Sequence, residues 1–286
     1  MTPVLTIARL TLKEAARRRL LRVLTILTLI CVGLTAWLVS ATTGPAREFG
    51  AEPVFVEIGI ALILVVCAFM FSFILAMTAG FLASPAIASD IESGIAQALL
   101  ARPIRRSEYL IGRWLGLAIV IAAYAIASGL LEIAVVALIS GYWPPEPLVA
   151  VVFLAFEAII MLTLGLLLST RLSAVAGGAI TVVAFALPWL TGVIGGIATG
   201  LGSRGVEATV NLVSIVLPID LVWRGVIYGL QPLSVRNFAG GQFNQALEAF
   251  PFYQPDPPSL LVIGGATAWI VVVLGLAIRT LDRREV

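Results

Sequence analysis

The sequence predicts an all-α integral membrane protein with six transmembrane helices, and its composition and charge spacing carry that prediction. Hydrophobic residues make up 60% of the chain and charged residues only 12%, where a soluble domain carries about 25% charge. Four stretches contain no charged side chain, and each exceeds the roughly 20 residues that cross a bilayer: 23–46, 58–89, 172–203 and 257–278. We therefore expect residues 1–286 to form a single transmembrane domain.

Residues 1–19 predict an N-terminal amphipathic interfacial helix. Arg9, Lys13 and Arg17 recur at steps of four residues, while apolar residues occupy another face. A secretory leader fits badly, because this segment is charged and the first apolar stretch begins only after it. We expect the helix to lie along the membrane and to contact lipid.

Six apolar segments of spanning length follow this leader. In chain order, the predicted spans are 20–41, 54–82, 109–140, 148–170, 173–199 and 259–277. Pro85 is expected to end the second helix, because proline removes a helical hydrogen bond. Pro144 and Pro145 predict a tight turn between the third and fourth spans.

The section 202–258 separates the last two spans and is polar, proline-rich and aromatic-rich. Its residues 206–230 are apolar but are interrupted by Asp220 and Arg224, and such a charge at mid-bilayer costs about 2.5–3.5 kcal/mol. We therefore expect extracytoplasmic interfacial or re-entrant helices between spans 5 and 6. Asp220 lies four residues before Arg224, which favours an ion pair on a helix, either as a lid over an exit or as a solvated helix face.

The loops differ in charge and thereby predict the orientation. Most Arg and Lys residues gather before the first span, between spans 2 and 3, and after the sixth span. The positive-inside rule places these regions, and with them both termini, in the cytoplasm.

The cytoplasmic link between spans 2 and 3 is the most informative segment. Residues 88–102 have the pattern of a short amphipathic helix, with Ile91, Ile95 and Leu99 on one face and a terminating Pro103. A half-apolar helix outside the bilayer needs a surface to cover it. Either lipid headgroups or a partner protein would do so.

The same link contains an ordered set of acidic, glycine, leucine, proline and basic positions. They are Asp90, Glu92, Gly94, Leu99, Leu100, Pro103, Arg106, Glu108, Gly112 and Arg113. In this order the link resembles that of the type-two ABC exporter permeases, except that Ile95 stands where Thr is usual. The charged leader, the six spans, the segment VLPIDLVWRG at 216–225 and the ending IRTLDRREV are similar to that family as well.

The resemblance implies the permease subunit of an ATP-driven exporter in the cytoplasmic (inner) membrane of a bacterium or archaeon. It implies that residues 88–102 are a coupling helix that docks on a separate P-loop ATPase subunit. The implied contact residues are Asp90, Glu92, Gly94, Leu99, Leu100, Arg102, Pro103 and Arg106. ATP and Mg would bind to that partner, and the absence of a G-x-x-x-x-G-K-[ST] motif in this chain agrees. The chain itself would be neither an enzyme nor a nucleic-acid binder, and would hold no cofactor.

Three carboxylates lie within or beside predicted spans: Glu57, Glu132 and Glu157. Glu132 and Glu157 are equally far from the turn between spans 3 and 4, which places them about 12 and 14 Å below the outer surface. All three carboxylates are candidates for a site that binds a substrate or a proton. Glu132 and Glu157 would share a pocket for a cation or a proton, and buried helix-packing groups are the alternative. In either case we expect at least one to be protonated or matched by a hydrogen-bond donor, such as Ser128 beside Glu132.

Gly192, Gly196 and Gly200 recur at four-residue steps in the fifth span. Small residues at that spacing let helices approach closely, so they predict an interface with a second permease copy or a homologue. Packing within the chain is the alternative.

Two other functional classes are alternatives to an exporter. An ion-coupled secondary transporter could use the membrane carboxylates, but the chain lacks an evident internal repeat. An intramembrane hydrolase would need a nucleophile and a base, and the chain has no His and no G-x-S-x-G motif. With no His and only Cys31 and Cys67, we expect free thiols and no metal site.

Overall fold

A computed structural model describes residues 3–17, 19–48, 50–94, 104–200, 204–236 and 252–284. These residues form helices and connecting segments, without a strand among them. The helices are α1 (Pro3–Arg17), α2 (Arg19–Glu48), α3 (Pro53–Glu92), α5 (Arg106–Ser140), α6 (Pro147–Ser169), α7 (Ala174–Gly200), α8 (Arg204–Val216), α9 (Ile219–Leu230), α10 (Leu233–Arg236) and α12 (Leu260–Asp282). Six of the described helices, α2, α3, α5, α6, α7 and α12, are long and apolar enough to cross a membrane. The predicted all-α fold with six spans is confirmed.

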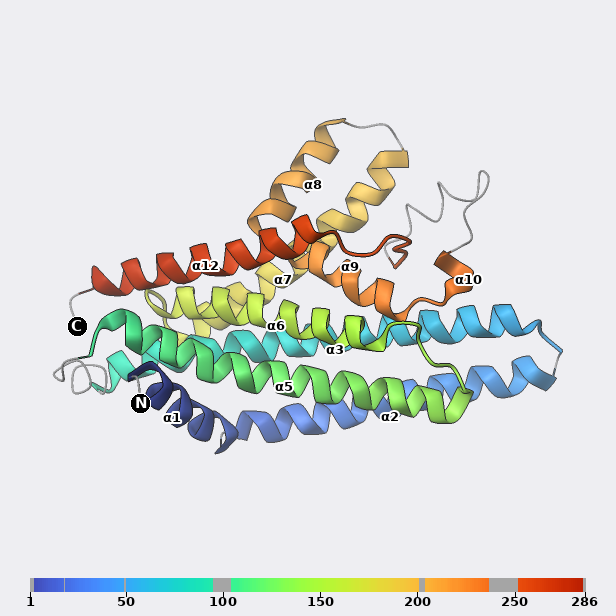
Figure 1. The fold of residues 1–286 in the computed structure, drawn as a ribbon, viewed down its shortest axis with the longest axis horizontal. Coiled ribbons are helices and arrows are strands. Elements are labelled where there is room, and N and C mark those ends of the chain that lie inside the picture. Colours follow the sequence, from blue (N-terminus) through green and yellow to red (C-terminus); the bar gives the residue numbers. More distant parts are fainter. Residues whose placement is uncertain are drawn as a thin grey trace.

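The long helices lie side by side, and both chain termini are found at one end of the bundle (Figure 1). We call this the terminal end and the opposite end the far end. Helix α6 lies among α3, α5, α9 and α12 and is the most buried of the six spans. Its sequence is apolar on all sides, which suits a helix surrounded by other helices.

Helix α3 continues through Pro85 to Glu92, so the prediction that Pro85 ends this helix is wrong. An internal proline costs about 3 kcal/mol, but the residues around it are buried against neighbouring helices and hold the helix together. The helix ends at Glu92, and the turn that follows contains Gly94, whose φ of +74° favours glycine. Residues 88–92 of the expected coupling helix are therefore the last turn of α3, and residues 95–103 lie outside the described part of the chain.

Helix α1 packs across the beginning of α5, a contact that periodicity did not predict. A Cβ atom at Gly112 would lie 2.7 Å from Cβ of Ile7, and one at Gly116 would lie 2.6 Å from the carbonyl oxygen of Ala8. These glycines let the two helix backbones approach closely. The outer face of α1 leaves Leu10 61% exposed, which suits contact with lipid.

The segment 206–230 is two helices rather than one. α8 and α9 meet at a bend of 89°, next to Pro218, which cannot donate a backbone hydrogen bond. Helix α8 and the end of α7 project from the bundle, whereas α9 returns to it (Figure 1). Gly225 and Gly229 bring α9 against Phe153 and Ala150 of α6.

Candidate functional site

A buried ion pair joins the two ends of the link between α3 and α5. The Asp90 carboxylate, near the end of α3, pairs with the Arg113 guanidinium on α5 and accepts a 2.5 Å hydrogen bond from the Tyr109 hydroxyl. Asp90 is 6% exposed and Arg113 is 8% exposed. Removing one member of such a pair leaves a buried charge without compensation, which costs about 3–5 kcal/mol. The pair therefore fixes where the link leaves and re-enters the bundle.

Helix α1 is tied to the same guanidinium. Nη1 of Arg113 lies 2.6 Å from Oε2 of Glu14, while Nη2 binds Asp90. The planar guanidinium thus binds carboxylates from two helices through two nitrogens, a geometry that a lysine ammonium does not reproduce. We name Glu14, Asp90, Tyr109 and Arg113 the link cluster.

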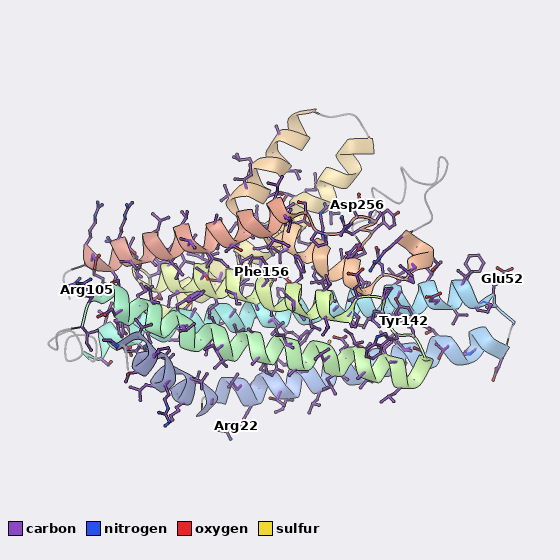
Figure 2. The ribbon with its side chains drawn as sticks, in the orientation of Figure 1. Arg22, Glu52, Arg105, Tyr142, Phe156 and Asp256 are labelled. Atoms are coloured by element: carbon purple, nitrogen blue, oxygen red, sulfur yellow. The ribbon has the colours of Figure 1, made fainter. Side chains whose placement is uncertain are left out.

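A second set of contacts joins the start of α5 to the end of α12. Nη1 of Arg106 donates to the carbonyl oxygens of Leu281 at 2.7 Å and Arg284 at 2.7 Å. Cations are stabilised at helix C-termini, where carbonyl groups lack helical partners. Arg284 in turn donates to the carbonyl oxygen of Thr170, at 2.7 Å, between α6 and α7. These contacts connect the start of α5, the end of α12 and the segment between α6 and α7. Arg105 lies at the same, terminal end of the bundle (Figure 2).

The structure places the described contact residues in different environments. The carboxylate of Asp90 and the guanidinium of Arg106 are bonded within the chain rather than presented on a free surface. Glu92 is exposed at the end of α3, and a Cβ at Gly94 would meet nothing within 4 Å. Leu99, Leu100, Arg102 and Pro103 lie outside the described residues.

Glu132 and Glu157 are buried, 3% and 2% exposed, and each accepts a hydrogen bond from a hydroxyl group. Thr35 of α2 donates to Glu132 at 3.1 Å, and Ser72 of α3 donates to Glu157 at 2.7 Å. The expectation that at least one has a donor is confirmed. The donor to Glu132 is not Ser128, whose hydroxyl bonds the carbonyl oxygen of Tyr124.

The two carboxylates do not share the described cavity. The cavity beside Glu132 is lined mainly by apolar residues of α3, α5, α6 and α9, and Glu157 is not among its lining residues. A common binding site for the two groups thus stays a prediction.

Glu57 lies in a separate, open pocket of about 500 Å³ at the far end of the molecule, where Figure 2 places Tyr142. The pocket is formed by the start of α3, the end of α5 and the residues after it, Gly141, Tyr142 and Trp143. The Tyr142 hydroxyl donates to the carbonyl oxygen of Leu230 at 2.6 Å. Burial raises the pKa of the Tyr142 phenol, and the nearby Glu57 carboxylate raises this pKa further, so the phenol stays neutral.

Asp220 and Arg224 form the predicted ion pair, with 3.1 Å between Oδ2 and Nε. Asp220 also faces Gly192, where a Cβ would lie 2.7 Å from its Oδ1. Gly192 therefore serves packing within the chain. The surroundings of Gly196 and Gly200 lie outside the described part, so the dimer interface stays a prediction. The role of Asp220 and Arg224 as a lid stays a prediction as well.

Sequence reasoning missed two residues that form ion pairs between helices or segments, Glu14 and Arg236. Glu14 is the first acidic residue of a basic leader, and that isolated charge could have marked it. Arg236, 9% exposed, binds Glu146 at 3.0 Å and stacks 3.7 Å from the Tyr228 ring. No spacing in the sequence relates these three positions.

Cys31 and Cys67 are free and buried, as expected. The described residues contain no group of three potential metal ligands.

A bundle with six apolar helices of spanning length and a braced link at one end defines a multi-pass membrane protein. The family model described as ABC-2 family transporter protein matches residues 5–286. The chain therefore belongs to the ABC-2 transporter family, as its link residues predict. No curated protein is similar enough to match the chain.

Proposed function

We propose that this chain is the permease subunit of an ATP-driven exporter and that a separate P-loop ATPase subunit docks on the link between α3 and α5. Membership of the ABC-2 family supports the permease role. ATP and Mg would be bound by the partner, and the chain would work with a second permease copy or a homologue. Family membership also favours this proposal over an ion-coupled secondary transporter.

The bracing of the link is the observation that carries the proposal. Connecting segments are ordinarily mobile, and a mobile segment transmits little force. Here the link cluster fixes both ends, and Arg106 ties the start of α5 to α12. A displacement of the link would consequently move α1, α3, α5 and α12 together.

The position of the link supports a cytoplasmic partner. The end of α3 and the start of α5, between which the link runs, lie at the terminal end with both termini (Figure 1). This end collects most of the basic residues, which the positive-inside rule assigns to the cytoplasm. Glu92 is exposed where the link leaves α3, and we assign it to the contact with the partner.

Purification of the full chain from its native membrane tests the proposal. We expect a P-loop ATPase, identified by its sequence, to co-purify in stoichiometric amount. Glu92→Lys should reduce ATPase activity in the purified complex, because it reverses the charge at the contact. Glu48→Lys, at an exposed position at the end of α2, is the matched control. Purification without an ATPase, or equal activity in both variants, would contradict the proposal.

A further inference from the structure

The pocket at the far end contains a carboxylate that the exporter proposal does not use. Glu57 is half-buried one turn inside α3, and its side chain lines the open pocket of about 500 Å³. The ion pairs found among the described residues involve Glu14, Asp90, Glu146 and Asp220, but not Glu57. Partial burial of an unpaired carboxylate is unfavourable, and a bound cation would restore the lost stabilisation.

Aromatic side chains form another wall of this pocket. Tyr142 and Trp143 are consecutive, and Trp143 is 59% exposed. The hydrogen bond from Tyr142 to Leu230 occupies the hydroxyl and fixes the ring in the wall. Aromatic faces attract organic cations that lie within about 6 Å of the ring centre.

The remaining lining is largely apolar and includes Pro53, Val56 and Ile60. Such a surface suits a hydrocarbon body better than a hydrated metal ion, because hard cations need six or more oxygen ligands. The Glu57 carboxylate would repel anions. The pocket thus combines one negative charge, two aromatic rings and an apolar wall.

We propose that this pocket binds an organic ammonium group, with Glu57 opposite the charge and the Tyr142 and Trp143 rings against the attached methyl or methylene groups. The ammonium group can come from two sources: a soluble amine, or the headgroup of a lipid such as phosphatidylethanolamine. The site is independent of the exporter proposal, because it lies at the end opposite to the link and needs no ATPase.

Equilibrium dialysis with radiolabelled phenyltrimethylammonium tests the site. The full chain is held in uncharged maltoside micelles, and empty micelles give the background. We expect saturable binding by the unmodified chain and an affinity that falls about tenfold or more in Glu57→Gln, because the charge is lost. Trp143→Ala should weaken binding as well. Glu48→Gln, at an exposed position outside the pocket, should bind like the unmodified chain.

Further measurements keep the result interpretable. Glu57→Asp retains the charge and should bind more tightly than Glu57→Gln, and monodisperse elution will show that each variant is folded. Competition by phosphatidylethanolamine supports a lipid source, and saturable binding without competition supports a soluble amine. An unmodified chain without saturable binding would overturn the proposal. Equal affinities of the unmodified chain and Glu57→Gln would do the same.

Discussion

Arg113 of α5 and Asp90 of α3 form a buried ion pair that closes the link between their helices. Asp90 precedes the link and Arg113 follows it, so their contact fixes the distance between the two ends of the link. Glu14 adds α1 to the same guanidinium. The Arg113 guanidinium therefore holds α1, α3 and α5 together at the link.

Replacing Arg113 by Ala should lower the free energy of unfolding by about 3–5 kcal/mol, because the buried Asp90 carboxylate would lose its counter-charge and keep only the hydrogen bond from Tyr109. Denaturant titration of the purified chain in detergent measures the change. The double variant Asp90→Asn/Arg113→Gln should recover part of the loss. Arg283→Ala, at an exposed position near the end of α12, is the control, and an equal loss in that variant would contradict the assignment.

Gly112 and Gly33 offer a matched test of the contact between α1 and α5. Both lie inside helices, where glycine to alanine gains about 1 kcal/mol of helix propensity. A Cβ at Gly33 meets nothing within 4 Å, whereas one at Gly112 meets Ile7 at 2.7 Å. We expect Gly33→Ala to stabilise the chain and Gly112→Ala to destabilise it. Thermal unfolding, followed by circular dichroism, measures the stability of both variants. Stabilisation by both substitutions would refute the close approach of α1 and α5.

Arg106 should protect the last turn of α12 from hydrogen exchange. Its guanidinium bonds the carbonyl oxygens of Leu281 and Arg284, and such charge-assisted bonds contribute about 1.5–3 kcal/mol. In Arg106→Gln, amides after residue 277 should exchange about tenfold faster or more, as measured by mass spectrometry. Arg279→Gln, exposed on the same turn, should leave these rates unchanged. Unchanged rates in Arg106→Gln would rule out the bracing.

Glu157 should tolerate glutamine but not leucine if its role is to accept the Ser72 hydrogen bond. Glutamine keeps a carbonyl acceptor, so we expect Glu157→Gln to remain within about 1 kcal/mol of the unmodified chain. Leucine leaves the buried Ser72 hydroxyl without this acceptor and should cost about 1–3 kcal/mol. The stability of the two variants in detergent provides the measurement. Equal stability would show that this hydrogen bond does not matter.

Much of the architecture could be predicted because the bilayer imposes it. Long charge-free stretches have few alternatives to spanning helices, so the six spans followed directly from the sequence. The continuation of α3 past Pro85 could not be predicted, because the packing that compensates for the proline comes from helices distant in the chain. The bend at Pro218 could not be predicted for a related reason, since α9 turns back to pack on α6, where Gly225 lies against Phe153.

The candidate site was predicted in part. Asp90, Gly112 and Arg113 stood out in the sequence, but their pairing with each other and with α1 depends on the three-dimensional path of the chain. Glu132 and Glu157 lie within helices of spanning length, as the apolar segments around them predict, whereas their equal depth in the membrane stays a prediction. Their hydroxyl partners could not be predicted, because depth along a helix does not determine which neighbour it faces.

Site-specific photo-crosslinking from position 92 is the most direct test of the central claim that an ATPase subunit docks on the link. p-Benzoylphenylalanine is incorporated at Glu92 or, as a control, at Glu48, and native membranes are irradiated. We predict a covalent adduct between the chain and a P-loop ATPase subunit from position 92 and none from position 48. Adducts with lipid alone from position 92, or an ATPase adduct only from position 48, would contradict the account.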